Sequence, residues 1–176
     1  NIMVDKRGVV KIMDFGLAKV LQPDMKSTKV MGTPHYMSPE QFEGKQVDGR
    51  TDIYSLGVTY YYVLSKARPY EGTNTVQIIY AILTSEPKSL LEANPNVPPE
   101  IWTIIQKMIA KKVDERYKDL REVRKDLLAY QEKSLADRVT CPQCGARNQR
   151  GKKFCRQCGG NLQVKCPACG ADEVAG

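Results

Sequence analysis

The sequence predicts an α+β fold, in which a mainly α-helical domain with an N-terminal β-hairpin precedes a small cysteine-rich unit. Three observations predict it. Short runs rich in β-branched residues open the chain, apolar residues at helical spacing dominate from Asp52 to about Tyr130, and all six cysteines follow position 140. The chain has 176 residues, 41% of them hydrophobic, which is enough for one main core and a satellite.

The predicted hairpin joins two short strands. Ile2–Val4 and Val9–Met13 are the β-branched runs, and Gly8 between them supplies the positive φ that the turn requires. A long stretch rich in Pro, Gly, Ser and Thr follows to about Gly49 and has no sustained period. A loop of this length inside a compact domain is usually functional.

Four segments then have apolar residues at helical spacing. Their members are Ile53, Leu56, Tyr60 and Leu64; Val76, Ile79 and Leu83; Ile101, Ile104, Ile105 and Met108; and Leu120, Val123 and Leu127. The helical register fades after Tyr130, so we expect a linker. The predicted organisation is a main domain at 1–133, a linker at 134–140, a zinc ribbon at 141–164 and the start of a second ribbon at 165–176.

The net charge of +7 is concentrated in the cysteine-rich segment. Its basic residues are Arg138, Arg147, Arg150, Lys152, Lys153, Arg156 and Lys165, with no acid among them. The remaining 20 basic residues balance the 20 acidic ones. No apolar run long enough to span a membrane and no signal peptide is visible, and the chain starts at Asn1, so we expect a cytoplasmic fragment.

Three motifs follow one another at characteristic spacing. Asp14-Phe15-Gly16 comes directly after a strand, Gly32–Glu40 reads G-T-P-H-Y-M-S-P-E, and Thr51–Gly57 reads T-D-I-Y-S-L-G. In order, spacing and content they resemble the eukaryotic-type (Hanks-type) Ser/Thr protein kinases that also occur in bacteria. The resemblance covers roughly residues 1 to 130 and implies the C-lobe of a kinase.

The resemblance implies a set of nucleotide-site residues. Asp14 is similar to the D-F-G aspartate, which binds the Mg²⁺ that bridges the ATP phosphates, and Asn1 is similar to the catalytic-loop asparagine that holds a second Mg²⁺. Met3 resembles the apolar floor beneath the adenine, with plain core packing as the alternative. Thr33 resembles the threonine that bonds the catalytic aspartate and lysine of Ser/Thr kinases.

Other residues of the resemblance have regulatory or structural roles. Ser27, Thr28 and Thr33 would be phosphosites of the activation segment, with solvated hydroxyl groups as the alternative for the first two. Glu40 would pair with Arg116 in a buried ion pair. The remaining structural residue is Asp52, which would accept backbone N–H groups of the catalytic loop; we expect His35 to be an exposed loop residue.

The first four cysteines have the spacing of a structural zinc site. Cys141/Cys144 and Cys155/Cys158 form two C-x-x-C pairs, each followed by a glycine that lets the turn close. A redox role is the alternative, but it needs a thioredoxin-like βαβ context that the sequence lacks. Cys166 and Cys169 open a third pair, which resembles the first half of a second ribbon and supplies only two Zn²⁺ ligands.

The expected function is transfer of the ATP γ-phosphate to Ser or Thr of protein substrates, in signal transduction. The glycine-rich loop, the phosphate-binding lysine and the H-R-D base would lie before Asn1, so we expect the fragment to be inactive alone. One alternative is a pseudokinase scaffold, although Asp14 and Asn1 are intact. Another is a nucleic-acid module, but Phe154 is the single aromatic residue between 138 and 165, so docking of proteins or self-association is favoured.

Overall fold

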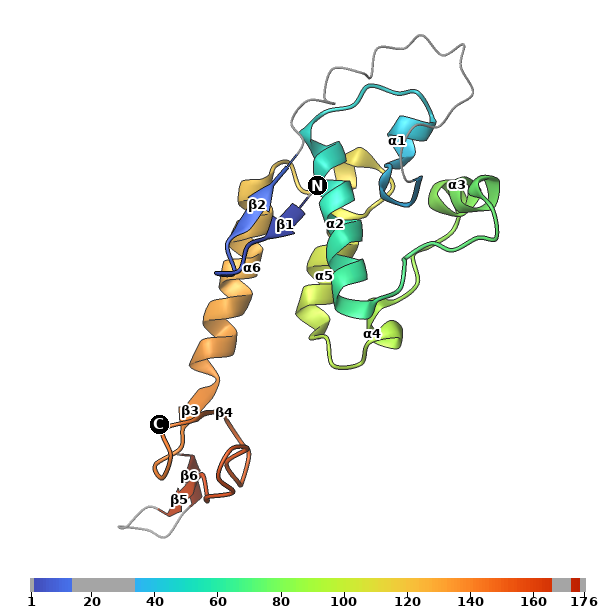
Figure 1. The fold of residues 1–176 in the computed structure, drawn as a ribbon. Helices are drawn as coiled ribbons and strands as arrows, with labels where there is room; N and C mark the ends of the chain where they lie inside the picture. Colours follow the sequence, from blue (N-terminus) through green and yellow to red (C-terminus); the bar gives the residue numbers. More distant parts are fainter. Residues whose placement is uncertain (1, 14–33, 166–171, 175–176) are drawn as a thin grey trace. The chain divides into compact units, whose positions relative to one another are not determined.

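The computed structural model describes residues 2–13, 34–165 and 172–174, and the chain divides into two compact units at Pro34 (Figure 1). The first unit contains the hairpin. Strand β1 (Ile2–Val4) pairs antiparallel with β2 (Val10–Ile12). Gly8 has φ 80°, and its N–H donates to the Asp5 carbonyl at 2.9 Å. The predicted hairpin and its glycine turn are therefore confirmed.

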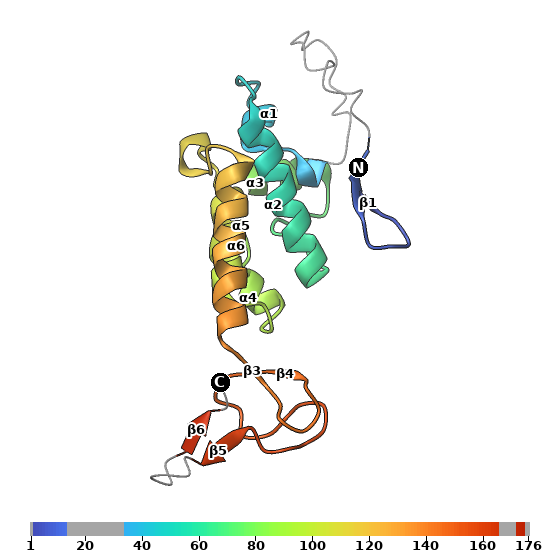
Figure 2. The ribbon, with the colours of Figure 1, turned by 90° about the vertical axis from the view of Figure 1, so that its left-hand side faces the viewer.

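The second unit begins with a helical region (Figure 2). Its α-helices are α1 (Pro39–Phe42), α2 (Gly49–Ser65), α3 (Thr75–Thr84), α4 (Leu90–Ala93), α5 (Pro99–Met108) and α6 (Leu120–Ala136), with 3₁₀ turns η2 (Pro34–Tyr36) and η3 (Val113–Glu115). All four segments with helical spacing are helices. No helix in the described ranges is long and apolar enough to cross a membrane.

Helix α2 lies at the centre of the helical core and packs against α5. Its residues Tyr54, Val58 and Tyr61 belong to one buried cluster, together with Ile105 of α5. Ile53, one residue before Tyr54, belongs to a second cluster that also contains residues of α5 and α6. The central helix is thus apolar on more than one side, which is why it must be enclosed by other helices.

The helix starts follow from polar side chains that accept hydrogen bonds from free backbone N–H groups. Asp48 accepts from Arg50 N at the start of α2, and Asp119 accepts from the N–H groups of Arg121 and Glu122 at the start of α6. Pro99 is the first residue of α5, a position where proline costs no helical hydrogen bond. These local signals fix where α2, α5 and α6 begin.

Helix α6 continues to Ala136, so the expectation that the helix fades after Tyr130 is wrong. The next strand, β3, already begins at Arg138, which leaves Asp137 as the only residue between them. Residues 131–136 are Gln, Glu, Lys, Ser, Leu and Ala, most of which are good helix formers, with no glycine or proline. A solvent-exposed helix end can form from residues of high helix propensity without apolar residues at helical spacing.

The ribbon segment (residues 138–165) is a set of short strands and cysteine turns. Strand β3 (Arg138–Thr140) pairs antiparallel with β4 (Arg147–Gln149), and β5 (Gln163–Lys165) pairs with β6 (Asp172–Val174). Its core is small and consists of Val139, Leu162 and two cysteines. A core of this size needs further stabilisation, which metals usually provide in units of this length.

Gly57 of α2 permits close packing of α2 against the end of α5. A Cβ there would lie 2.7 Å from Ile109 Cγ2 and 2.8 Å from Met108 Cβ. We expect Gly57→Ala to lower the free energy of unfolding by about 1–3 kcal/mol, because the contact overpacks the core. The measurement is urea denaturation followed by circular dichroism.

The matched control is Gly49→Ala at the first residue of α2, where an added Cβ meets nothing within 4 Å. It should leave stability unchanged or slightly higher because alanine favours the helix. Equal stability of both variants would show that the α2–α5 contact is not tight.

Candidate functional site

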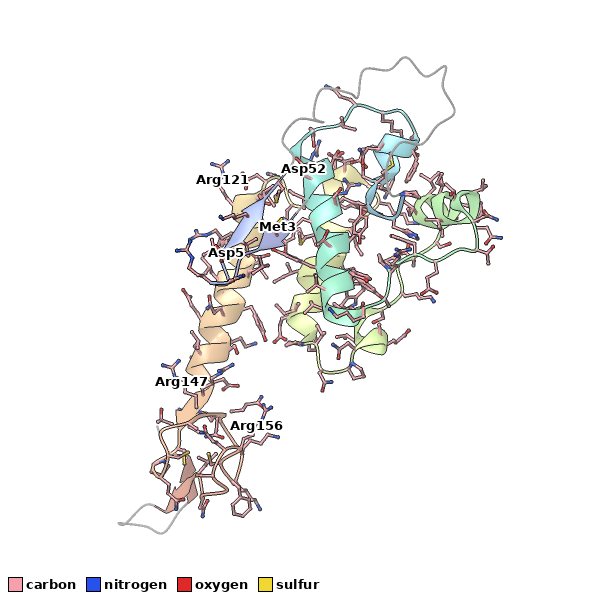
Figure 3. The ribbon with its side chains drawn as sticks, in the orientation of Figure 1. Met3, Asp5, Asp52, Arg121, Arg147 and Arg156 are labelled. Atoms are coloured by element: carbon pink, nitrogen blue, oxygen red, sulfur yellow. The ribbon has the colours of Figure 1, made fainter. Side chains whose placement is uncertain are left out.

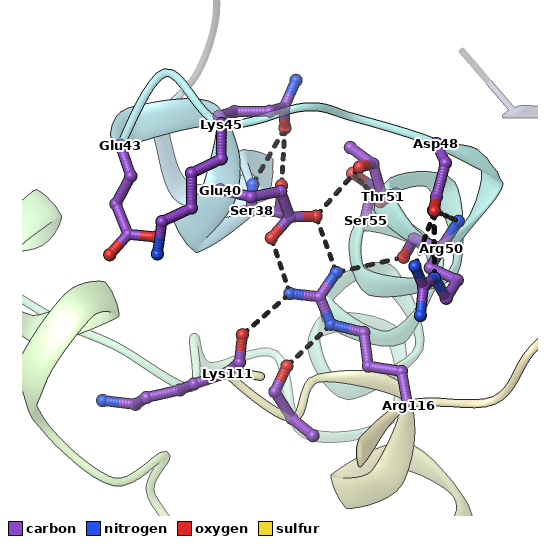
Figure 4. Close-up of polar contacts among 12 residues, drawn as sticks. Ser38, Glu40, Glu43, Lys45, Asp48, Arg50, Thr51, Ser55, Lys111 and Arg116 are labelled. Atoms are coloured by element: carbon purple, nitrogen blue, oxygen red, sulfur yellow. Dashed lines mark hydrogen bonds and ion pairs between the residues drawn. The ribbon is translucent and has the colours of Figure 1, made fainter. Parts of the chain in front are cut away.

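A buried ion pair joins Glu40 of α1 to Arg116 (Figure 4). The pair is bidentate: Arg116 Nη1 donates to Glu40 Oε1 and Arg116 Nη2 donates to Glu40 Oε2, both at 2.7 Å. The side chains are 0% and 4% exposed. The contact predicted from the family resemblance is therefore present in the structure.

The rest of the guanidinium group is also satisfied. Arg116 Nε donates to the Ala110 carbonyl at 2.7 Å, Nη1 donates to the Arg50 carbonyl and Nη2 donates to the Lys111 carbonyl, both at 3.2 Å. All five N–H donors of an arginine thus have an acceptor. The arrangement secures three separate chain segments around one side chain.

Glu40 has a second hydrogen-bond donor that the sequence analysis missed. Thr51 Oγ1 donates to Glu40 Oε1 at 2.9 Å. Ser38 caps α1, and its backbone N–H donates to Gln41 Oε1 at 2.9 Å, so Ser38 and Gln41 form a capping box. The S-x-x-Q spacing of Ser38 and Gln41 is a sequence signal that could have revealed this cap.

The charge of Glu40 is held by its partners. Burial alone would raise its pKa, but the hydrogen bonds and charge of Arg116, with those of Ser38 and the backbone, lower the pKa from 4.5 to about 2. The folded state therefore favours the ionised carboxylate more than the unfolded state does. The resulting stabilisation is complete above about pH 4.5 and is lost as the pH falls toward 2.

The structure describes only some of the other residues of the predicted kinase site. Asn1, Asp14, Ser27, Thr28 and Thr33 lie outside the described residues.

The described residues of the predicted site are Met3 and Asp52, which are both exposed (Figure 3). Met3 is in β1 and is 55% exposed. Asp52 is in the first turn of α2, and its carboxylate accepts no hydrogen bond from the described residues. Its predicted role therefore stays a prediction.

The expectation that His35 is an exposed loop residue is wrong. His35 lies half-buried in the turn η2. Its Nε2 contacts Arg68 Nη1, and burial followed by the Arg68 charge lowers its pKa. The tight turn at Pro34–Tyr36 folds the imidazole ring toward the loop that contains Arg68. The sequence around His35 gives no signal for this contact, because Arg68 is 33 positions away.

The ribbon segment brings four cysteine sulfurs together. The Sγ atoms of Cys141, Cys144, Cys155 and Cys158 all lie within 4.8 Å of one another. Cys141 Sγ is 3.7 Å from Cys158 Sγ, and Cys144 Sγ is 3.6 Å from Cys155 Sγ. A tetrahedral zinc with bonds of about 2.3 Å has sulfur–sulfur edges of about 3.8 Å, so the cluster fits one Zn²⁺ ion.

Each cysteine pair is shaped by a glycine turn. Gly145 and Gly159 have φ of 71° and 72°, and their N–H groups donate to the carbonyls of Cys141 and Cys155 at 3.0 and 2.9 Å. The predicted role of both glycines is confirmed, because L side chains rarely adopt this φ. The two knuckles are near copies of each other.

Asn148 supports the cysteine cluster from β4. Its Nδ2 donates to Cys155 Sγ at 3.4 Å and its Oδ1 accepts from Arg156 N at 2.9 Å. Backbone N–H groups, that of Cys158 first, lower the pKa of Cys155 to about 6, with Asn148 adding to the shift. These donors stabilise a thiolate, which is the form that binds zinc. Cys166 and Cys169 lie outside the described residues.

Comparisons with known proteins agree with this geometry. The "protein kinase domain" family model matches residues 1–128, and the "double zinc ribbon" model matches residues 141–175. The kinase match covers most of the chain, so the chain belongs to the protein kinase domain family.

Several relatives of the chain are bacterial proteins. The serine/threonine-protein kinase PknB of Mycolicibacterium smegmatis is 37% identical over 141 residues, which are 78% of this chain and 23% of that protein. A probable serine/threonine-protein kinase of Streptomyces coelicolor is 36% identical over 73% of this chain and 20% of its own length. A probable serine/threonine-protein kinase PknB of Bifidobacterium longum is 37% identical, with 74% and 19% covered. The chain thus spans about a fifth of the length of these curated relatives.

Removal of Arg116 tests the buried ion pair. We expect Arg116→Ala to lower the free energy of unfolding by about 3–5 kcal/mol, because it leaves the Glu40 carboxylate buried without its partner. The measurement is chemical denaturation at pH 7 and at pH 3. The loss should be smaller at pH 3, because the unfolded wild type already binds the Glu40 proton there and the pair contributes less to stability.

The matched control is Arg121→Ala, whose side chain is 91% exposed and pairs with Asp119 on the surface. It should leave the denaturation midpoint unchanged, because exposed ion pairs contribute little. If Arg116→Ala unfolds at the wild-type midpoint while phosphoryl transfer by a longer chain is lost, Arg116 has a chemical role and not a structural one.

The proposed zinc site is tested by measuring the mass of the native protein and the effect of a chelator on folding. Mass spectrometry under non-denaturing conditions should find one zinc held by the cysteines of the ribbon segment, and a chelator should unfold this segment while the helical core keeps its circular dichroism. Cys155→Ser should lower the zinc content to a small fraction of the wild-type value. A chain without zinc, and unaffected by the chelator, would contradict the metal site.

Proposed function

We propose that this chain is part of a Ser/Thr protein kinase that transfers the γ-phosphate of ATP to protein Ser or Thr residues. The observation that carries the proposal is the buried Glu40–Arg116 pair, which fixes the end of the run Gly32–Glu40 against the helical core. Membership of the protein kinase domain family and the names of the relatives support it. The activity is proposed for a longer protein that includes this segment.

In this proposal Asp14 and Asn1 hold Mg²⁺. Carboxylate and amide oxygens are the hard ligands that Mg²⁺ prefers, and Asp14 follows a strand that can aim it into a cleft. Mg²⁺-bound ATP supplies the phosphoryl group when bound. Met3 would contact the adenine from the hairpin.

The segment before α1 is proposed to face the protein substrate. Thr33 would bond the catalytic aspartate and lysine of the longer protein, which favours Ser and Thr as acceptors. Ser27, Thr28 and Thr33 are proposed phosphosites, because added phosphate can order a loop through nearby cations. Within this run the structure describes residues 34–40, and Glu40 at its end is held by Arg116.

The ribbon segment is proposed to bind one structural zinc and to serve protein docking or self-association. The basic residues around the cysteine cluster, and the absence of a second aromatic residue between 138 and 165, support proteins over nucleic acid as partners. Cys166 and Cys169 would begin a second ribbon. We place the kinase part at 1–133 and the two ribbons at 141–164 and 165–176. Residues 134–140, expected as a linker, include the end of α6 at Ala136 and the strand β3 from Arg138.

The proposed chemistry is tested in a chain that contains this segment and the upstream kinase residues. Asp14→Asn should lower phosphoryl transfer to a protein substrate by about a hundredfold or more, because it removes a charge that neutralises the phosphate oxygens. The measurement is transfer of labelled γ-phosphate followed by phosphoamino-acid separation.

Glu43→Gln serves as the charge-matched control, since Glu43 lies on the surface and pairs with Lys45 at 2.8 Å. It should transfer phosphate at the wild-type rate. Phosphotyrosine as the main product would contradict the Ser/Thr assignment, and wild-type activity of Asp14→Asn would contradict the role of Asp14.

A further inference from the structure

A groove lies between the last turn of α6, the start of α5 and the ribbon segment, all within the second unit. Its volume is about 770 Å³, in the range of clefts that bind small ligands. The Arg150 N–H donates to the Asp137 carbonyl at 2.7 Å, which joins the ribbon segment to the end of α6.

The groove is strongly basic. Arg138, Arg147, Lys152 and Arg156 line it, and none of their side chains forms an ion pair or a hydrogen bond with the described residues. The two carboxylates in its lining do not neutralise them, because Glu100 pairs with Lys133 at 3.3 Å. Asp137, the other carboxylate, cannot offset four cations.

The arrangement of the cations follows from the strand register. On the pair β3–β4, Arg138 lies opposite Gln149 and Arg147 lies opposite Thr140, so both arginines share the outer face, on which neighbouring strands place side chains diagonally about 7–8 Å apart. The inner-face residues Val139 and Asn148 are buried. Like charges at this spacing repel, and an anion bound between them relieves the repulsion.

Asn148 fixes a third cation through the cysteine cluster. Its Oδ1 accepts from Arg156 N, while its Nδ2 contacts Cys155 Sγ. Arg156 therefore takes its place from the fold of the ribbon and not from a flexible loop. Figure 3 labels Arg147 and Arg156, which lie at the end of the ribbon that adjoins α6.

The groove is lined by apolar, amide and charged side chains, and this combination favours a protein partner over nucleic acid. Pro95, Pro98 and the 65% exposed ring of Phe154 provide apolar contacts, and the amide side chain of Gln149 can bond a peptide backbone. A continuous phosphate backbone would meet the carboxylates of Glu100 and Asp137 and a single aromatic ring, which suits nucleic acid poorly. Carboxylates at spaced positions suit the separate guanidinium groups, because arginine binds them bidentately.

We propose that this groove binds an extended acidic segment of a partner protein, in which Asp or Glu side chains contact Arg138, Arg147 and Arg156 and an apolar residue contacts Phe154. The inference rests on the docking role proposed for the ribbon segment and names its surface and the chemistry of the partner. Zinc acts indirectly, since the cysteine cluster positions Asn148 and thereby Arg156.

The test measures binding of the zinc-loaded chain 1–176 to a fluorescein-labelled decapeptide with Glu at alternate positions and one Leu, by fluorescence anisotropy. The matched peptide has Gln in place of every Glu. We expect the Glu peptide to bind and Arg147→Gln/Arg156→Gln to weaken it about tenfold or more. Phe154→Ala should weaken binding of the same peptide to a lesser extent.

The control is Arg150→Gln/Lys153→Gln, which removes the same charge from exposed side chains that do not line the groove. It should change the affinity about twofold or less, since screened distant charges act weakly. Equal losses in the two double variants, or equal binding of the Gln peptide, would overturn the proposal. Tighter binding of a labelled single-stranded oligonucleotide than of the peptide would also overturn it.

Two parallel readouts separate this inference from the proposed function. Zinc content shows that each variant keeps its ribbon, and sedimentation velocity measures self-association of the same samples. A chain that self-associates through the ribbon but ignores the acidic peptide would contradict the groove and leave the docking role in place. Phosphoryl transfer, measured on the longer chain, does not depend on the result.

Discussion

The bidentate bond between Glu40 and Arg116 is the interaction on which the helical region depends. The two residues are 76 positions apart, and both are buried. A buried ion pair stabilises a protein only when its remaining donors and acceptors are satisfied. Here Arg116 also donates to the carbonyls of Arg50, Ala110 and Lys111, so the bond connects α1, the start of α2 and the chain after α5. One side chain therefore holds these segments together.

The same centre explains why polar residues gather where apolar packing would be expected. Thr51 gives Glu40 a further hydrogen bond, and the Arg116 guanidinium lies over the ring of Tyr54, 4.9 Å from its centroid. Tyr54 in turn belongs to the main apolar cluster. The charged centre thus borders the hydrophobic core directly, and the helix that carries Thr51 and Tyr54 contributes to both.

The sequence was sufficient for features that depend on local patterns. Helical spacing predicted α2, α3, α5 and α6 but not the short helices α1 and α4. Gly8 predicted the hairpin turn, and the two C-x-x-C pairs predicted the cysteine cluster. Contacts over long separations needed more: the Glu40–Arg116 pair came from family resemblance, and the carbonyls around Arg116 follow only from the folded path. The end of α6 was missed because an exposed helical turn has no apolar face and therefore no apolar spacing to detect. The His35–Arg68 contact was missed because it joins two segments that are distant in the sequence.

The ribbon segment must also be stabilised, but it has no large apolar core. Val139 and Leu162 bury little apolar surface, so the fold must rest on the four cysteine sulfurs. Four thiolates around a bound Zn²⁺ would carry a net charge of about −2 and offset part of the positive charge of this segment. Such an offset would reduce the repulsion between Arg138 and Arg147, which share one face of a two-stranded sheet. Their exposed guanidinium groups can exchange water for the carboxylates of an acidic partner.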